Sequence, residues 1–305
     1  MMVLTTDNYY DNAADMEYMS CSQYQGFLRC EAMQTAKLQG RFTEEKSEAL
    51  IVGNYVHSYM EGSEPHEEFC NEHFHDIYKT KQIVDKKTGE VTELVTGKYA
   101  AYVTADKMLE VINNDRTLTK FRNMDGHVEE IMTGQIYGVP WRIRMDKRIE
   151  SPRIILDWKT SANIRDLTYN RVTKEWETFI EAHGYMMRAA VYSEIEKQNT
   201  GLKSDPMFLI AAVSKQDPPD KGLYCLNHKD RYLFELEKIK ENLPRIMRVK
   251  DGSELPRKCG KCEYCRSTMG HLQIQPYYVL KPENWEGWEL DERARTVVAD
   301  TSQEA

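Results

Sequence analysis

The sequence lacks any uninterrupted apolar run near the roughly 20 residues that span a membrane, which excludes a bundle of transmembrane helices. It also lacks the charged-then-apolar amino terminus of a secreted protein, so we expect a cytoplasmic location and no membrane partner. It contains no internal repeat and no low-complexity block. With 305 residues and 41% apolar content, the chain can bury a large core, either as one elaborated α/β domain or as two small ones.

An excess of basic charge is missing too, since 41 lysines and arginines stand against 49 acidic residues, a formal net charge of −8. The whole surface therefore cannot coat nucleic acid, and any DNA contact requires basic side chains focused at a groove. Three segments concentrate basic side chains in this way. The alternative for each single residue is an ordinary solvent-exposed charge. They carry Arg142, Arg144, Lys147, Arg148 and Arg153; Arg257, Lys258, Lys261 and Arg266; and Arg165, Tyr169, Arg171, Lys174 and Trp176.

Disulfides are not expected, because the seven cysteines are an odd number and no secretory signal precedes them. Three of them follow the spacing Cys259-x-x-Cys262-x-x-Cys265. A tight turn with this spacing can present several thiolates to one metal ion or cluster. Three thiolates are one short of a closed site. The alternative is a set of reduced, unliganded cysteines.

Two acids and a lysine stand at the ends of predicted neighbouring strands. Asp157 and Lys159 follow a short apolar run, and Asp146 lies in an alternating segment that begins at Trp141. Side chains at positions i and i+2 of a strand project to the same side, so Asp157 and Lys159 are expected to share a face and to converge with Asp146. An ordinary surface strand end is the competing interpretation.

These residue types suit metal-dependent cleavage of a phosphodiester. Magnesium, or manganese in its place, prefers oxygen ligands, and Asp146 with Asp157 would supply two carboxylates. A metal-bound water loses its proton more easily, and the metal neutralises charge that develops on the transition state. Lys159 would lower the pKa of the attacking water or hold it in line.

Two predicted helices could add to this site. An apolar-periodic stretch, 49–60, carries His57, which is either a third metal ligand or a core histidine. A second helix is predicted from about Phe179 to Glu196. It places Tyr185, Arg188 and Tyr192 on one stripe.

The ordered set of motifs resembles the RecB-like nucleases of the PD-(D/E)XK superfamily. The set comprises Gly53-x-x-x-His57, Glu130 with Gly134, Asp146, Asp157-Trp158-Lys159 and Tyr185-x-x-Arg188-x-x-x-Tyr192. Segments 7–10, 17–20 and 137–141 further resemble the phage exodeoxyribonuclease VIII-type domain. The resemblance implies a restriction-endonuclease-like α/β core, a mixed central β-sheet flanked by helices, and magnesium-dependent DNA cleavage. The family usually has glutamine where this chain has Arg188.

The same resemblance implies a fourth ligand for the cysteine-rich knuckle at residues 257–268. Related nucleases join one early cysteine to three late ones around a 4Fe-4S cluster, which makes Cys30 the candidate and Cys21 its substitute. The early helix is predicted to open at Ser22 and to close near Gly40. In those nucleases the spacing between the last two cysteines is longer than in this chain. Zn²⁺ is therefore an alternative to the cluster, because soft thiolates are good ligands for it.

We therefore predict a magnesium-dependent exonuclease that acts on the ends of double-stranded DNA. Asp146, Asp157 and His57 would bind the metal, Lys159 would assist the water, and Arg188 with Tyr192 would contact the substrate or support the site, with Glu130 as a further candidate. The resemblance adds phage recombination in a bacterial host cell, with a single-strand annealing recombinase and a homo-oligomer as candidate partners. An endonuclease with the same site and a non-catalytic DNA-binding or assembly subunit are the alternatives.

Two further expectations concern organisation. The nuclease domain is predicted to span residues 1–275, and residues 276–305 to form a partly mobile extension. A decoy metal site lies between the motifs, with His66, Cys70, His73 and His75 among many glutamates. Such a stretch is typical of a solvated acidic face.

Overall fold

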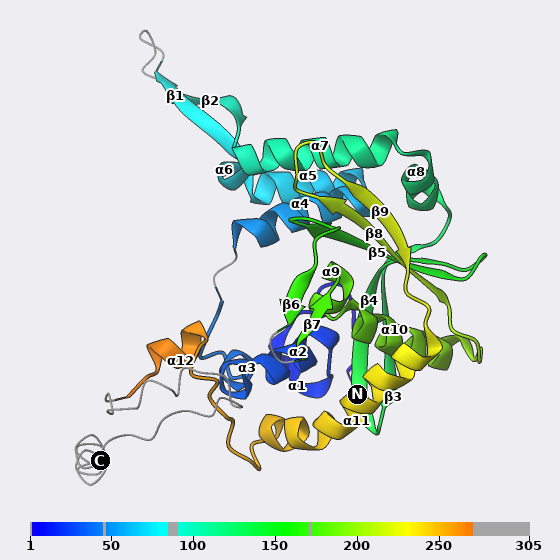
Figure 1. The fold of residues 1–305 in the computed structure, drawn as a ribbon. Coiled ribbons are helices and arrows are strands. Elements are labelled where there is room, and N and C mark those ends of the chain that lie inside the picture. The colour runs from blue at the N-terminus through cyan, green and yellow to red at the C-terminus, as the bar shows by residue number, and fades with distance from the viewer. Residues whose placement is uncertain (1, 45–46, 85–90, 171–172, 271–305) are drawn as a thin grey trace.

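A five-stranded mixed sheet forms the centre of the computed structural model, which describes residues 2–44, 47–84, 91–170 and 173–270 (Figure 1). Its strands are β3 (His127–Ile136), β4 (Val139–Ile149), β5 (Ile154–Ser161), β8 (Met207–Ser214) and β9 (Lys221–Cys225), in the order β3-β4-β5-β8-β9. Only β5 and β8 pair in parallel; the other neighbours are antiparallel. This arrangement confirms the predicted mixed-sheet α/β fold.

The sequence explains the two central strands and the first hairpin. β5 and β8 carry near-continuous apolar runs and are buried on both faces, as parallel strands between helical layers usually are. The β3–β4 hairpin turns through Tyr137 and Gly138, with φ values of 51° and 78°. Positive φ at both turn residues matches the right-handed twist of the flanking strands.

Helices cover both faces of the sheet. One apolar cluster joins β5 and β8 to α4 (Glu48–Glu61), α7 (Ala100–Asn114) and α8 (Arg116–Asn123). The other cluster joins the sheet to α2 (Cys21–Arg29), α10 (Tyr185–Thr200) and α11 (Lys229–Lys250). The chain therefore forms three layers, with the carboxyl ends of β5 and β8 enclosed between α4 and α10.

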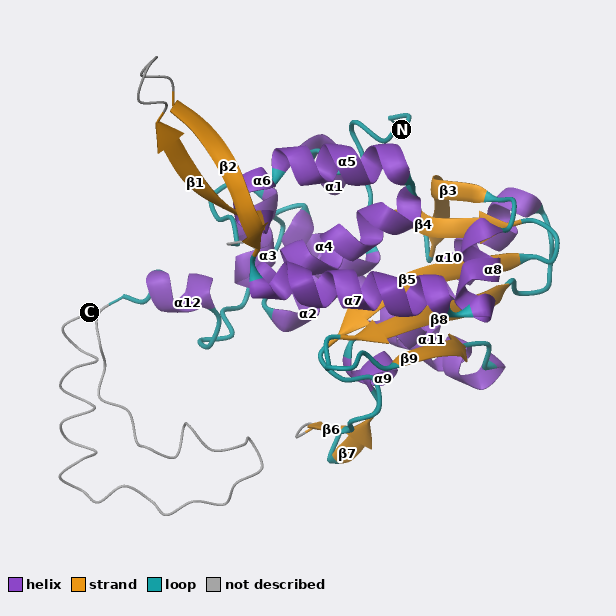
Figure 2. Cartoon of the chain, turned by 90° about the horizontal axis from the view of Figure 1, so that it is seen from above, coloured by secondary structure: helices purple, strands orange, loops and turns teal. Residues whose placement is uncertain are grey.

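Shorter elements surround these layers. They are α1 (Asn12–Glu17), α3 (Glu31–Leu38), α5 (Ser63–Glu72), α6 (Phe74–Ile77), α9 (Phe179–Ala182), α12 (Glu263–Ser267) and the hairpin strands β1 (Tyr78–Val84), β2 (Val91–Lys98), β6 (Thr168–Asn170) and β7 (Glu175–Glu177). Figure 2 shows the β1–β2 hairpin projecting away from the sheet. In the described ranges, no helix combines the length and apolarity needed to cross a membrane.

Two segments that were each predicted as one continuous helix are divided into two helices in the structure. The early helix begins after Ser20, whose Oγ accepts from the Gln23 N–H, and it breaks at Cys30, which is extended with φ −166° and ψ 108°. The later helix is divided into α9 and α10 by Gly184, which adopts the left-handed φ of 67° that glycine tolerates. The predicted extension at 276–305 lies outside the described residues.

Candidate active site

Asp146 and Asp157 lie across from each other where β4 and β5 separate. The β4–β5 ladder ends with the pair Lys147–Leu156, so the next position on each strand is an aspartate. Beyond that pair the Trp158 N–H donates to Oδ2 of Asp146 over 2.7 Å. A side chain therefore replaces the strand partner, and both carboxylates lie just beyond the end of the ladder.

Lys159 lies between these two carboxylates. Its Nζ is 2.6 Å from Oδ2 of Asp157 and 3.7 Å from Oδ2 of Asp146. Burial alone would lower the pKa of Lys159, but the two aspartates outweigh it and raise the pKa above its usual value. Lys159 is therefore a cation at neutral pH, so it donates hydrogen bonds and does not take up a proton. The structure brings the predicted triad together.

His57 reaches the same group from α4. Its Nε2 lies 3.1 Å from Oδ2 of Asp146, and its Nδ1 lies 2.8 Å from Oε1 of Glu61. One turn earlier, Gly53 faces Oγ1 of Thr160, which a Cβ at this position would meet at 3.4 Å, an ordinary van der Waals contact. The charge of Asp146 raises the pKa of His57 to about 11 despite burial, which acts in the opposite direction.

Glu129 belongs to this cluster and Glu130 does not. In the β3–β4 ladder, Val128 pairs with Lys147 and Glu130 pairs with Met145, so Glu129 lies opposite Asp146. Its Oε1 lies 3.7 Å from Nε2 of His57, and its Oε2 lies 2.5 Å from Nε of Arg144. Glu130 points away and binds Nε of Arg148 over 2.5 Å. Neighbouring strand residues face opposite sides, so the structure does not bring Glu130, the predicted candidate, to the cluster and brings its neighbour Glu129 there instead.

A signal for Glu129 was present in the sequence. Glu129 lies eight positions before Tyr137, and Asp146 lies eight positions after Gly138, so the two carboxylates are symmetric about a two-residue hairpin turn. Glu129 also adopts φ 54°, a left-handed backbone that costs a non-glycine residue roughly 1–2 kcal/mol. Only the structure reveals this conformation.

The donor atoms fit a hard divalent cation. His57, Glu61 and Glu129 present ligand atoms that all lie within 4.8 Å of one another. Burial, followed by the charge of Asp146, raises the pKa of Glu129 to about 7. Its Oε1 is buried and makes no hydrogen bond within the described part of the chain. Carboxylates crowded in this way are the oxygen ligands that magnesium and manganese prefer.

The remaining predicted site residues lie on α10. Nη1 of Arg188 is 3.5 Å from Oδ1 of Asp157, so Arg188 neutralises the side of that carboxylate that Lys159 leaves free. The buried Tyr192 donates to the carbonyl of Arg144 over 3.0 Å and thereby ties α10 to β4. Arg188 therefore contacts the cluster directly, and Tyr192 supports it from behind.

Two cavities meet at this cluster, and both include Asn54 and His57 in their lining. One, of about 310 Å³, also includes Lys159 and Arg188. The other, of about 440 Å³, is lined by Glu61, Glu68, Glu72 and His73 together with Arg144 and Tyr10. A cationic space and an acidic space thus adjoin on either side of His57.

Comparison with known proteins identifies the family. A family model described as "PDDEXK-like domain of unknown function (DUF3799)" matches residues 20–268. This chain belongs to that PDDEXK-like family. A crystal structure from Eubacterium rectale described as a "Putative exonuclease" is 32% identical, with a TM-score of 0.78, and the match covers 93% of this chain and 100% of that one.

Other comparisons add nothing to this assignment. The crystal structure of SSO0001 is 13% identical over 77% of this chain and 91% of its own length, and its TM-score of 0.31 is too low to support an inference. None of the curated proteins matches significantly. The PDDEXK-like domain predicted from the ordered motifs is therefore confirmed by the family model and by its similarity in fold to the E. rectale protein.

The PDDEXK-like domain also brings the four predicted cysteines together. Sγ of Cys30 is 3.6 Å from Sγ of Cys265, and Sγ of Cys259 is 3.9 Å from the same atom. With Cys262, all four sulfurs lie within 4.8 Å of one another. Cys21 is instead buried in the core beside α10, so it is not the substitute ligand.

The basic residues of β4 are engaged in contacts within the protein. Arg142 pairs with Asp15, Arg144 with Glu129, Arg148 with Glu130, and the neighbouring Arg153 with Glu196. Lys147 donates to the carbonyl of Arg122. The predicted basic focus on this strand is therefore a set of internal ion pairs and hydrogen bonds. Arg171 lies outside the described residues.

Two other features of the PDDEXK-like domain are separate from the cluster. The histidines of the segment 66–75 make local contacts, such as Nδ1 of His66 with Oγ of Ser58 at 2.9 Å and Nδ1 of His73 with Asp76 at 3.0 Å.

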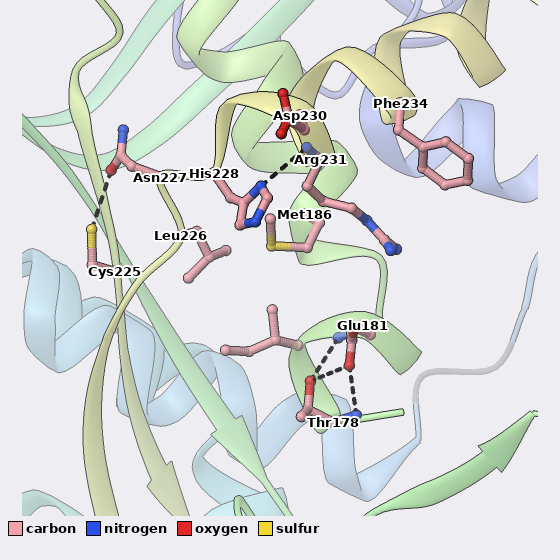
Figure 3. Close-up of a pocket in the computed structure, with 11 residues that line it drawn as sticks. Thr178, Glu181, Met186, Cys225, Leu226, Asn227, His228, Asp230, Arg231 and Phe234 are labelled. Carbon is pink, nitrogen blue, oxygen red and sulfur yellow. Dashed lines mark hydrogen bonds between the residues drawn. The ribbon is translucent and has the colours of Figure 1, made fainter. Parts of the chain in front are cut away.

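A larger cavity of about 700 Å³ lies between α9 and the start of α11, where His228 accepts from the Arg231 N–H (Figure 3). Its lining includes none of the clustered acids, so size does not identify the site.

Proposed function

We propose that this protein is a magnesium-dependent DNA exonuclease whose active site is the cluster of Asp146, Asp157, Lys159 and His57. The observation that carries the proposal is Lys159 bridging two carboxylates at the splayed ends of β4 and β5. The exonuclease class is also supported by the description of the E. rectale protein. Manganese would serve in place of magnesium.

Asp146, Asp157 and His57 would hold the metal, with Glu129 and Glu61 as additional oxygen ligands. Burial on its own would raise the pKa of Asp146, but His57 and Lys159 hold it well below its usual value, so this carboxylate stays ionised. The bound metal would lower the pKa of a water and neutralise charge on the phosphate and the leaving oxygen. Lys159 would donate to the attacking water and orient it.

The cationic cavity would receive the scissile phosphate. Lys159 and Arg188 both line it, and Arg188 faces Asp157 from α10. Arginine presents several fixed N–H donors, so it can bind a phosphate oxygen while one N–H remains on the carboxylate. Its substitution for the family's usual glutamine therefore adds a charge without removing a donor.

The segment that follows β5 would contact the bases. Its β6–β7 hairpin carries Tyr169 and Trp176, whose rings lie 5.3 Å apart and are 46% and 65% exposed. Exposed aromatic rings stack on unpaired bases irrespective of sequence. This hairpin connects the catalytic strand to α9 and α10, so a strand held there would be near the cluster.

Cleavage of two labelled DNA substrates tests the proposal. The wild-type protein with magnesium should degrade a linear duplex and leave a covalently closed circle intact. Asp157→Asn and Lys159→Ala should each lower the rate on the order of 10³-fold, because each removes a charge that the transition state requires. Asp217→Asn, at an exposed aspartate paired with Lys107, is the matched control.

The alternatives correspond to other outcomes of the same assay. Nicking of the closed circle would indicate an endonuclease with the same site. Equal rates for wild type and both site variants would indicate a non-catalytic DNA-binding subunit. A role in phage recombination in the host cytoplasm, with a single-strand annealing recombinase and a homo-oligomeric assembly, and a nuclease domain that ends near residue 275, extend the proposal through the family resemblance.

A further inference from the structure

The four clustered cysteines come from two distant parts of the chain. Cys30 occupies the extended break between α2 and α3, and the other three lie in the turn 259–262 and the first turn of α12. Cys30 and Cys265 are buried, whereas Cys259 and Cys262 are partly exposed. Ala32, Met33, Phe42 and Tyr264 pack around these sulfurs, so the four cysteines lie in a small apolar cluster of their own.

The turn is shaped to direct two sulfurs inward. Gly260 has the left-handed φ of 72°, which allows the N–H groups of Lys261 and Cys262 to donate to Sγ of Cys259 over 3.4 and 3.3 Å. The Cys265 N–H donates to Sγ of Cys262 over 3.4 Å. Backbone donors of this kind stabilise thiolates and fix their direction.

The distances between sulfurs distinguish a single ion from a cluster. Four thiolates about 2.3 Å from one tetrahedral ion are about 3.8 Å from each other. The observed separations of 3.6 and 3.9 Å match this value, and every pair lies within 4.8 Å. In a four-iron cluster each thiolate binds a different corner, so the sulfurs are roughly 6 Å apart and the cluster body fills the space between them.

The family resemblance implies a 4Fe-4S cluster, and these four residues do not fit it. We propose that Cys30, Cys259, Cys262 and Cys265 bind one tetrahedral zinc ion. A closed set of four cysteines is a donor set typical of structural zinc, and it leaves no position for a substrate. The ion would fasten the turn 259–265 to the junction of α2 and α3, at a position distinct from the clustered acids. The inference does not depend on nuclease activity.

Metal and sulfide analysis of the full-length protein tests this proposal. The protein should be purified anaerobically from cells supplied with both iron and zinc, so that neither metal is limiting. We expect about one zinc per chain, no acid-labile sulfide and no absorption band near 400 nm. Iron with sulfide in comparable amounts, or zinc well below one per chain, would overturn the proposal.

Variants then test the ligand set. Cys30→Ser and Cys265→Ser should each lose bound zinc. Cys21→Ser and Cys225→Ser should retain it, because Cys21 lies in the apolar cluster that contains α10 and α11, and Cys225 is exposed. If the ligand variants do not fold, replacement of zinc by cobalt in the wild type gives an independent readout. The visible spectrum of tetrahedral thiolate-bound cobalt is the expected result, and a spectrum of octahedral cobalt would contradict the proposal.

Discussion

The two ligand clusters of this protein differ in what balances their charge. In the acid cluster, Asp146 and Asp157 contact His57, Lys159 and Arg188, so protein cations already neutralise the carboxylates. In the cysteine cluster, the hydrogen-bond partners of the sulfurs within the described ranges are one another and backbone groups. The first cluster is internally compensated, and the second is not.

This difference predicts distinct roles for the two proposed metals, one in catalysis and one in the stability of the fold. Salt bridges hold the acid cluster together without a divalent ion, so the proposed metal could leave and return without loss of the fold. Thiolates crowded within 4.8 Å repel one another unless a cation lies between them. Under the two proposals, metal binding at the cysteines would be coupled to folding, whereas metal binding at the acids would be coupled to catalysis.

Selective removal of each metal gives the largest contrast. Transfer of the protein into magnesium-free buffer should lower the cleavage rate by about 10³-fold or more and leave the Tm within about 2 °C of its starting value, because the ion pairs of the acid cluster remain. A thiol-reactive mercurial that releases zinc should lower the Tm by about 5 °C or more. Calorimetry and the linear-duplex assay measure both effects. A large fall in Tm in magnesium-free buffer, at unchanged zinc content, would show that the acid cluster is not self-compensated.

The neighbouring glutamates provide a sharper test of the acid cluster. Glu129→Gln should raise the magnesium concentration needed for half-maximal activity about 10–100-fold, because it removes a carboxylate adjoining His57. Glu130→Gln should leave that concentration unchanged, because its carboxylate binds Arg148 on the other side of the strand. Titration of activity with magnesium separates the two. Equal effects would mean that strand orientation does not select the ligand.

Arg188 offers a smaller effect of the opposite sign on metal binding. Its charge competes with the metal for Asp157, so Arg188→Gln should lower the magnesium concentration for half-maximal activity about threefold to tenfold. The same change should raise KM for DNA, since a phosphate partner is lost. Arg188→Lys, which keeps the charge, is the control and should leave the magnesium requirement near that of wild type. Unchanged metal and DNA dependence in Arg188→Gln would remove Arg188 from the site.

Much of this arrangement follows from local sequence rules. Alternation along a strand places Asp157 with Lys159, and helical periodicity directs His57 and Arg188 toward them. These rules fix which side of an element a residue occupies, so they located the centre of the acid cluster. The family resemblance ordered the motifs and supplied Cys30.

The rest required three-dimensional information. The sequence pattern did not show that β4 pairs with β5 only from Lys147 to Ile149, which leaves Asp146 beyond the ladder, or that the arginines of β4 form internal ion pairs. Glu61 was missed because a glutamate one turn after a histidine on a helix is common and usually solvated. Distances between sulfurs likewise follow from packing and not from spacing along the chain.

The smallest expected effect concerns Lys250. Like Lys159 it is a partly buried lysine, but its hydrogen-bond partners are uncharged, whereas Lys159 contacts two carboxylates. Its Nζ donates to the Tyr18 carbonyl and to Oε1 of Gln23. Burial lowers the pKa of Lys250 to about 8, although Asp15 acts in the opposite direction, whereas the carboxylates raise the pKa of Lys159.

The sign of the resulting pH dependence follows from proton linkage. The unfolded chain keeps the ordinary lysine pKa of about 10.4, so between roughly pH 8 and pH 10 it binds more protons at this position than the folded chain does. Stability should therefore rise with pH across this window through Lys250, and Lys250→Met should remove that component. Urea unfolding of both proteins at several pH values gives the difference between them. Parallel curves would mean that Lys250 is as well compensated as Lys159, and that carboxylate partners are not what separates the two lysines.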